Sequence, residues 1–143
     1  MKYSEKLRDP RWQKKRLEIL SRDIWKCQLC GDSKNTLHVH HRRYLSKIDP
    51  WEYPDSLLVS LCEECHEIER AERSSYEDDL LEILKEKFFA PDLFDLLHGF
   101  YELELQGKSS IVSGAIENAL KKPEIQEYLI KIYLESKKGG FDI

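Results

Sequence analysis

The sequence predicts an α+β protein, in which a small core of two strands and flanking helices precedes an all-helical extension. Two Cys-x-x-Cys pairs flank two short segments with the apolar pattern of strands. Residues 10–22 carry apolar side chains at helical spacing, and residues 76–143 are rich in Leu, Glu and Lys at helical spacing. We therefore assign residues 1–75 to a core domain and residues 76–143 to a helical extension.

The N-terminal helix is expected over residues 10–22. Asp9 is a good N-cap, and a proline suits the first helical position because its missing N–H has no intrahelical acceptor there. Trp12, Ile19 and Leu20 fall near one stripe, which predicts that this stripe packs on the core. The exposed face of the helix is basic, so it could also touch a DNA backbone.

Two strands are expected between the cysteine pairs. In residues 36–41 apolar side chains alternate with His38 and His40, so the two histidines should share one face. Residues 57–61 are apolar at most positions and should form a second, largely buried strand. A helix is expected to follow over residues 62–74.

The cysteines indicate a structural metal site. The N-terminus has no apolar signal core, so we expect a cytoplasmic protein, in which disulfides are rare. Two close thiolate pairs satisfy a tetrahedral Zn²⁺ and leave no open position for a substrate. Gly31 would allow the positive φ that the first cysteine loop needs. We predict a structural Zn²⁺ that staples the core, with reduced, metal-free cysteines as the alternative; its ligands would be Cys27, Cys30, Cys62 and Cys65.

The extension should consist of four helices. Plausible start and stop signals bound them, with Gly107 and Gly139–Gly140 as stops. The expected ranges are 77–88, 91–105, 110–121 and 123–136. We place the domain boundary near residues 73–76. The extension should pack on the core or on itself, or serve as a homodimerisation or partner-docking unit.

The charge is distributed unevenly along the chain. The formal net charge is −4, but residues 1–50 carry +7 and residues 51–143 carry −11. The basic part can bind phosphates while the acidic part sets the overall sign. No apolar run is long enough to cross a membrane, so no membrane partner is expected.

These motifs together resemble those of the HNH endonucleases, a group of the His-Me finger (ββα-metal) nucleases. The resemblance covers about residues 5–70 and none of the extension. It rests on both cysteine pairs, the double histidine and a terminal histidine occurring in order. The matching segments are Asp9–Trp12, Lys15–Arg16, Arg22–Asp23, Cys27–Gly31, Leu37–His41, Pro50–Pro54 and Leu58–His66.

The resemblance implies a catalytic role for three histidines. His41 corresponds to the general base, which would accept a proton from the attacking water. His40 and His66 correspond to ligands of a catalytic divalent metal, expected to be Mg²⁺ or Mn²⁺, with Zn²⁺ or Ni²⁺ as alternatives. The substrate would be DNA, expected to be double-stranded. Nearby side chains are candidates for substrate contact: His38, Arg42, Arg43, Tyr44 and Lys47.

The chain departs from the family pattern at two positions. No Asn stands near Leu57, where the family's middle Asn would fall, so its bracing role would pass to Asp55 or Ser56 or be absent. Arg70 stands where many relatives have a further histidine ligand. We therefore expect two imidazole ligands, with waters and phosphate oxygens completing the metal shell.

Two other functions remain open from the sequence. A non-catalytic zinc module could bind nucleic acid or a protein without cutting it. RNA could replace DNA as the substrate, since nothing in these motifs reads a 2′-hydroxyl.

Overall fold

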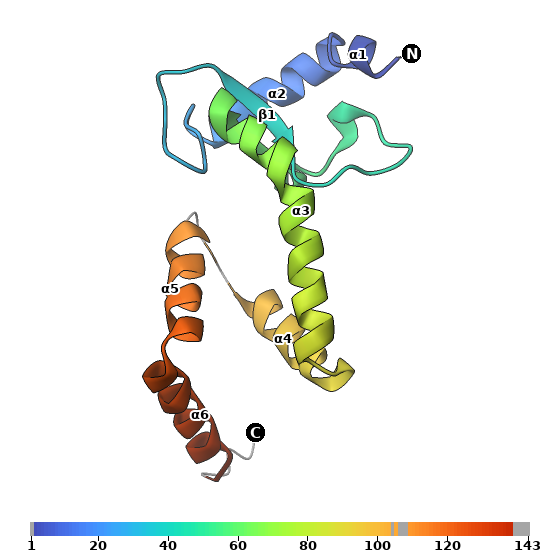
Figure 1. Ribbon diagram of the computed structural model, residues 1–143. Coiled ribbons are helices and arrows are strands. Elements are labelled where there is room, and N and C mark those ends of the chain that lie inside the picture. The colour runs from blue at the N-terminus through green and yellow to red at the C-terminus, as the bar shows by residue number, and fades with distance from the viewer. Residues whose placement is uncertain (1, 104, 106–108, 139–143) are drawn as a thin grey trace. The chain divides into compact units, whose positions relative to one another are not determined.

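The computed structural model describes residues 2–103, 105 and 109–138. It shows an α+β chain with an N-terminal helix, a β-hairpin that carries the four cysteines, and a mostly helical C-terminal region (Figure 1). The elements in chain order are α1 Tyr3–Lys6, α2 Pro10–Arg22, β1 Leu37–His41, η1 Pro50–Glu52, η2 Asp55–Leu57, β2 Leu58–Cys62, α3 Glu63–Lys87, α4 Ala90–Glu102, α5 Ser109–Lys121 and α6 Pro123–Lys138.

The predicted N-terminal helix is confirmed with its cap. α2 spans Pro10–Arg22, and the Asp9 side chain accepts a hydrogen bond of 2.9 Å from the backbone N–H of Arg11. Trp12, Ile19 and Leu20 are its buried residues, as the apolar stripe predicts. The helix therefore presents one apolar face to the hairpin.

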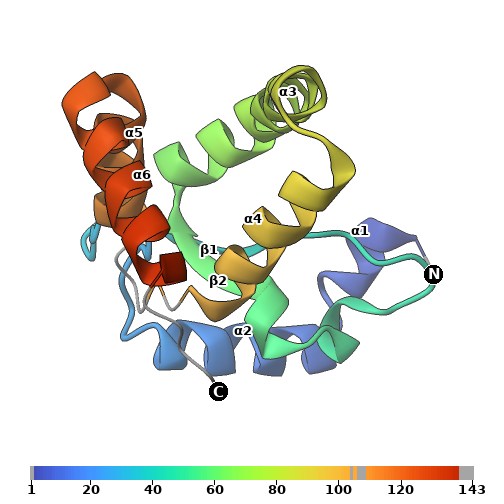
Figure 2. The same ribbon diagram turned by 90° about the horizontal axis from the view of Figure 1, so that it is seen from below.

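The hairpin lies between α2 and the first turns of α3 (Figures 1 and 2). β1 and β2 pair antiparallel with His38 opposite Leu61 and His40 opposite Val59. Because successive side chains of a strand point to opposite faces, His38 and His40 share the face turned to α3.

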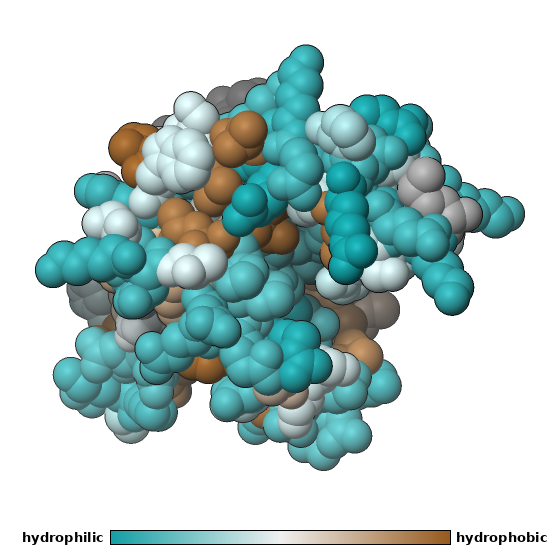
Figure 3. Space-filling view, turned by 90° about the horizontal axis from the view of Figure 1, so that it is seen from above, coloured by the Kyte–Doolittle hydropathy of each residue, from teal (hydrophilic) through white to brown (hydrophobic). Residues whose placement is uncertain are grey.

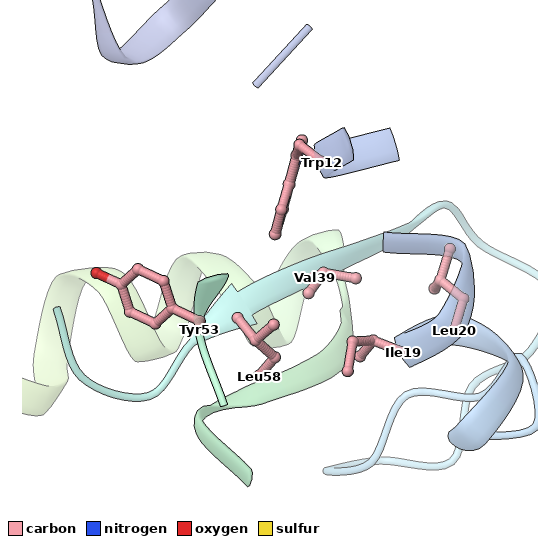
Figure 4. Close-up of a cluster of buried hydrophobic side chains, with 6 residues drawn as sticks. All are labelled: Trp12, Ile19, Leu20, Val39, Tyr53 and Leu58. Atoms are coloured by element: carbon pink, nitrogen blue, oxygen red, sulfur yellow. The ribbon is translucent and has the colours of Figure 1, made fainter. Parts of the chain in front are cut away.

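The main apolar core fills the space between α2 and the hairpin (Figure 4). Its buried side chains come from α2, both strands and the loop before η2, so it joins segments far apart in the sequence. They are Trp12, Ile19, Leu20, Val39, Tyr53 and Leu58. A second, smaller cluster lies around the cysteines and includes Val59 and Leu61.

α3 is longer than the sequence predicts. A helix ending near Ser74 and another beginning near Glu77 are expected, but the structure has one continuous helix over Glu63–Lys87. Arg73 pairs with Glu69 and Glu77, one turn to either side, and each pair adds a small stabilisation across the expected break. The boundary placed near residues 73–76 therefore falls inside a helix.

The chain divides into two compact units, residues 1–97 and 98–143. Within the second unit, α5 and α6 contact each other, and neither contains a buried residue. The stops expected at Gly107 and Gly139–Gly140 lie outside the described residues.

Among the described residues, no helix combines the length and the apolar character that crossing a bilayer requires. Hydrophilic side chains predominate on the face in Figure 3, where apolar ones form separate patches.

Candidate metal centre and histidine cluster

The four cysteines converge where the first cysteine loop meets the end of the hairpin. Their Sγ atoms all lie within 4.8 Å of one another, and those of Cys30 and Cys62 are 3.7 Å apart. A tetrahedral Zn²⁺ with Zn–S bonds of about 2.3 Å separates its sulfurs by about 3.8 Å. The cluster therefore has the donors and the spacing of a structural zinc site, as the sequence predicts.

The first cysteine loop is held in shape by backbone hydrogen bonds. The N–H of Gly31 donates to the carbonyl of Cys27 at 2.8 Å, and Gly31 has a φ of +81°. This is the left-handed conformation expected for a glycine there. The N–H of Gln28 donates to the carbonyl of Ser60 at 2.9 Å, which ties the loop to β2. Both cysteine pairs are therefore positioned by main-chain contacts.

The thiols differ in their readiness to ionise. Burial opposes ionisation of Cys27, but backbone hydrogen bonds from Cys30, Cys62 and Leu29 outweigh it and lower the pKa of Cys27 to about 6. Burial and then the neighbouring thiols raise the pKa of Cys65 well above its ordinary value. Four sulfurs in this space can all be thiolates only with a cation among them, which fits bound Zn²⁺.

Three imidazoles from two segments meet on the α3 side of the hairpin. The ring of His66, in the first turn of α3, stacks on that of His38 with centroids 5.3 Å apart. It meets the ring of His40 edge-on at 5.2 Å. Burial first, and then the neighbouring His66, lower the pKa of His40, so this imidazole favours the neutral form that binds metals.

His41 lies on the opposite face of β1, among aromatic rings. Its ring stacks on Trp12 at 5.3 Å and on Tyr44 at 5.4 Å, and it meets Tyr53 edge-on at 4.6 Å. The residue is 5% exposed, and its buried Nε2 has no hydrogen-bond partner among the described residues. Burial, followed by the charge of His40, lowers the pKa of His41 to about 4. The imidazole is therefore neutral at physiological pH.

One cavity of about 230 Å³ is lined by His40, His41 and His66, although the ring of His41 lies on the other face of β1 from the other two rings. The strand end contributes His40 and His41, and α3 contributes His66. The other lining residues are Arg42, Tyr44, Glu69, Arg70, Arg73, Ser74 and Glu77. A neighbouring cavity of about 260 Å³ is also lined by His38, His41, Tyr44 and His66. His41 therefore borders both spaces.

The candidate substrate residues separate into two groups. Arg42 and Tyr44 line the first cavity and His38 the second, whereas Arg43 and Lys47 are exposed on the loop after β1 and line neither.

Five lining residues on α3 are not among the candidates predicted from the sequence: Glu69, Arg70, Arg73, Ser74 and Glu77. Their spacing of three, four, seven, eight and eleven residues from His66 is the helical signal that could have identified them.

The segment where the family's middle Asn would fall is braced from α2. The carboxylate of Asp55 pairs with Lys15. Arg22 donates to the carbonyl of Asp55 at 2.6 Å and to that of Leu58 at 2.8 Å. These contacts hold η2 and the start of β2 without an asparagine.

Comparisons with family models, with curated proteins and with solved structures found no match for this chain. The described part of the chain is therefore characterised by its own features: an α+β arrangement, a hairpin stapled by a zinc-type cysteine cluster, and helices.

Proposed function

We propose that the core of this chain is an HNH-type (ββα-metal) endonuclease that hydrolyses phosphodiester bonds of double-stranded DNA. The observation that carries the proposal is the shared cavity of His40, His41 and His66, which arginines also line. These are the histidines that correspond in sequence to the family's base and metal ligands. Two observations support the proposal: the sequence resemblance, which implies the catalytic roles, and the cavity that all three histidines line.

His41 is in the neutral form that can accept a proton from water at physiological pH, and a pKa of about 4 makes it a weaker base than an ordinary histidine. Within the described part of the chain, no hydrogen-bond donor or acceptor occupies its Nε2. Trp12 and Tyr53 fix the ring from the core side, so its orientation is set before a substrate arrives. Tyr44, which is 68% exposed, stacks on the same ring and would have to move for water to reach it.

His40 and His66 would hold the catalytic cation, with Mg²⁺ or Mn²⁺ as the expected ions. Their rings lie close enough to face one ion, and both have lowered pKa values, first through burial and then through a neighbouring histidine. A bound divalent cation would stabilise negative charge on the phosphate and on the leaving oxygen.

Guanidinium groups would position the DNA backbone. Arg42, Arg70 and Arg73 line the cavity beside the histidines. Arginine matches phosphate oxygens with two parallel N–H donors, and such contacts fix register without reading sequence. The excess of positive charge in residues 1–50 supports binding along the same backbone.

A supercoiled plasmid tests the function directly. The zinc-loaded protein is incubated with the plasmid and Mg²⁺ or Mn²⁺, beside a sample to which no divalent cation is added. We expect nicked or linear DNA only with the added cation. Intact plasmid across a series of divalent metals, together with a gel shift of the DNA, would instead support the second candidate below.

The second candidate is a zinc-stapled module that binds nucleic acid or protein without cutting. One observation favours it, namely that His41 is enclosed by Trp12, Tyr44 and Tyr53. Replacing Tyr44 with alanine separates the two candidates. A nuclease should keep or increase its cutting when the cover is removed, whereas a binding module should cut in neither form.

We further propose that the second unit pairs with a second copy of this chain. Exposed apolar residues crowd α6, including Leu129, Ile130 and Tyr133, in a unit of only residues 98–143. A unit of this size gains little from its own core. The acidity of residues 51–143 argues against DNA as the partner of this surface.

A further inference from the structure

Glu69 occupies a position between the histidines and an arginine. Its Oε2 lies 4.0 Å from the Nε2 of His40 and 2.7 Å from the Nε of Arg73. Glu69 is three residues beyond His66, so the two side chains leave the same face of α3. The carboxylate therefore lines the cavity next to both proposed metal ligands.

We propose that Glu69 is a third protein ligand for the cation of His40 and His66, and that Arg73 holds this carboxylate until the cation binds. Resting on the proposed function, the assignment gives the metal site a ligand that the family pattern does not supply here. Glu69 would do the work of the histidine that is replaced by Arg70.

The separation of the Glu69 and His40 donor atoms suits one ion. Two donor atoms that each lie about 2.1 Å from an ion are roughly 3.0 Å apart at a right angle and 4.2 Å apart when opposite. The 4.0 Å between Glu69 and His40 falls within this range. Two imidazoles with one carboxylate also form a donor set that accepts several divalent metals.

Glu69 must exchange Arg73 for the cation as its partner if it is to be a metal ligand. Among the described residues, only the four cysteines place three or more donor atoms within 4.8 Å of one another, so Glu69 or His66 must turn to complete the set. Glu69 can turn because its carboxylate is held by one arginine at a partly exposed position. Arg73 keeps Glu77 as a partner at 2.8 Å when Glu69 leaves. The exchange therefore leaves no buried charge unpaired.

Manganese binding tests the assignment without relying on activity. The full-length, zinc-loaded protein is titrated with Mn²⁺, and free Mn²⁺ is followed by its electron paramagnetic resonance signal. Mn²⁺ is the weakest binder among the common divalent transition metals, so it leaves Zn²⁺ on the cysteines. We expect Glu69→Gln to weaken Mn²⁺ binding at least about tenfold. Arg73→Gln should strengthen it by roughly two- to fivefold, because the competing partner is gone.

Glu67→Gln is the matched control. Glu67 lies on the same helix, pairs with Arg70 at 2.6 Å and does not line the cavity. Glu67→Gln removes the same negative charge as Glu69→Gln. If both variants weaken Mn²⁺ binding equally, the effect of Glu69 is one of overall charge and not of metal ligation, and the assignment is overturned. Loss of Mn²⁺ affinity in both Glu69→Gln and Arg73→Gln would also overturn it. In that case the ion pair would serve only to hold the structure, because removing either partner would weaken Mn²⁺ binding.

The metal assignment and the nuclease function fail in different ways. Glu69-dependent Mn²⁺ binding by a protein that cuts no DNA would contradict the nuclease while the ligand assignment stands. DNA cutting by a protein whose Mn²⁺ affinity is unchanged in Glu69→Gln would contradict the ligand while the nuclease stands. Absence of saturable Mn²⁺ binding in the parent protein would contradict the ligand assignment outright.

Discussion

The carboxylate of Asp23 accepts a hydrogen bond of 2.8 Å from the backbone N–H of Ser60, in the middle of β2. Asp23 follows the last residue of α2, so this bond fastens the end of the helix to the hairpin. Burial raises the pKa of Asp23, but the hydrogen bonds from Arg22 and Ser60 outweigh it and lower the pKa overall. The carboxylate is therefore ionised in the folded protein at neutral pH.

Replacing Asp23 with alanine should lower the free energy of unfolding by about 2–3 kcal/mol, because a buried N–H loses a charged acceptor. Denaturant unfolding of the zinc-loaded protein measures the change. Asp78→Ala, which removes an exposed carboxylate from α3, is the control and should cost less. A change below about 0.5 kcal/mol in Asp23→Ala, the size expected at an ordinary surface position, would show that this bond does not stabilise the fold.

Zinc removal should unfold the core. The cysteine cluster joins the loop after α2 to the end of the hairpin, and the zinc-binding free energy of small structural sites, about 10 kcal/mol or more, is also folding free energy. We expect one Zn²⁺ per chain by atomic absorption, and none in Cys62→Ser. Thermal unfolding by circular dichroism should then lose its cooperative transition for the core. An apo-protein that melts like the zinc-loaded form would contradict this role.

Tyr53 ties down the loop after β1. Its hydroxyl accepts from the N–H of Leu45 at 2.8 Å and donates to the carbonyl of the same residue at 3.2 Å. Tyr53→Phe should cost about 1–2 kcal/mol, because both backbone groups lose their partner. Hydrogen exchange over residues 42–49 should accelerate. Unchanged protection there would mean that other contacts hold the loop.

Local signals explain how much of the fold could be predicted from the sequence. Asp9 and the proline after it mark the start of α2, and alternation around His38 and His40 marks β1, because caps and strand periodicity act within a few residues. The length of α3 is not predicted, although the spacing of Arg73 from Glu69 and Glu77 is a local helical signal across the expected break.

The candidate site was only partly predictable, because some of its contacts join segments that are far apart in the sequence. The cysteine spacing specifies its metal without further context. The enclosure of His41 depends on Trp12 and Tyr53, which reach it from other elements of the chain. Glu69 becomes a neighbour of His40 only when α3 packs on the strand that carries His40. Such contacts between distant segments leave no pattern in a single sequence.

The apolar face of α6 should make the protein dimeric. The proposed pairing predicts twice the chain mass of 17.0 kDa in sedimentation equilibrium. Leu129, which is 51% exposed in the single chain, is the position to change. Leu129→Asp should shift the equilibrium toward the monomer without loss of helix content. A parent protein that remains monomeric at high concentration would exclude the dimer.

The rate of DNA cutting by His41→Ala tests the central claim most directly. General-base catalysis contributes about 10²–10⁴-fold, so we expect a loss of at least a hundredfold, with zinc content and DNA affinity unchanged. His98→Ala, on α4 and outside the cavity, should cut at the parent rate. A His41→Ala protein that also cuts at the parent rate would contradict the assignment of this histidine as the base.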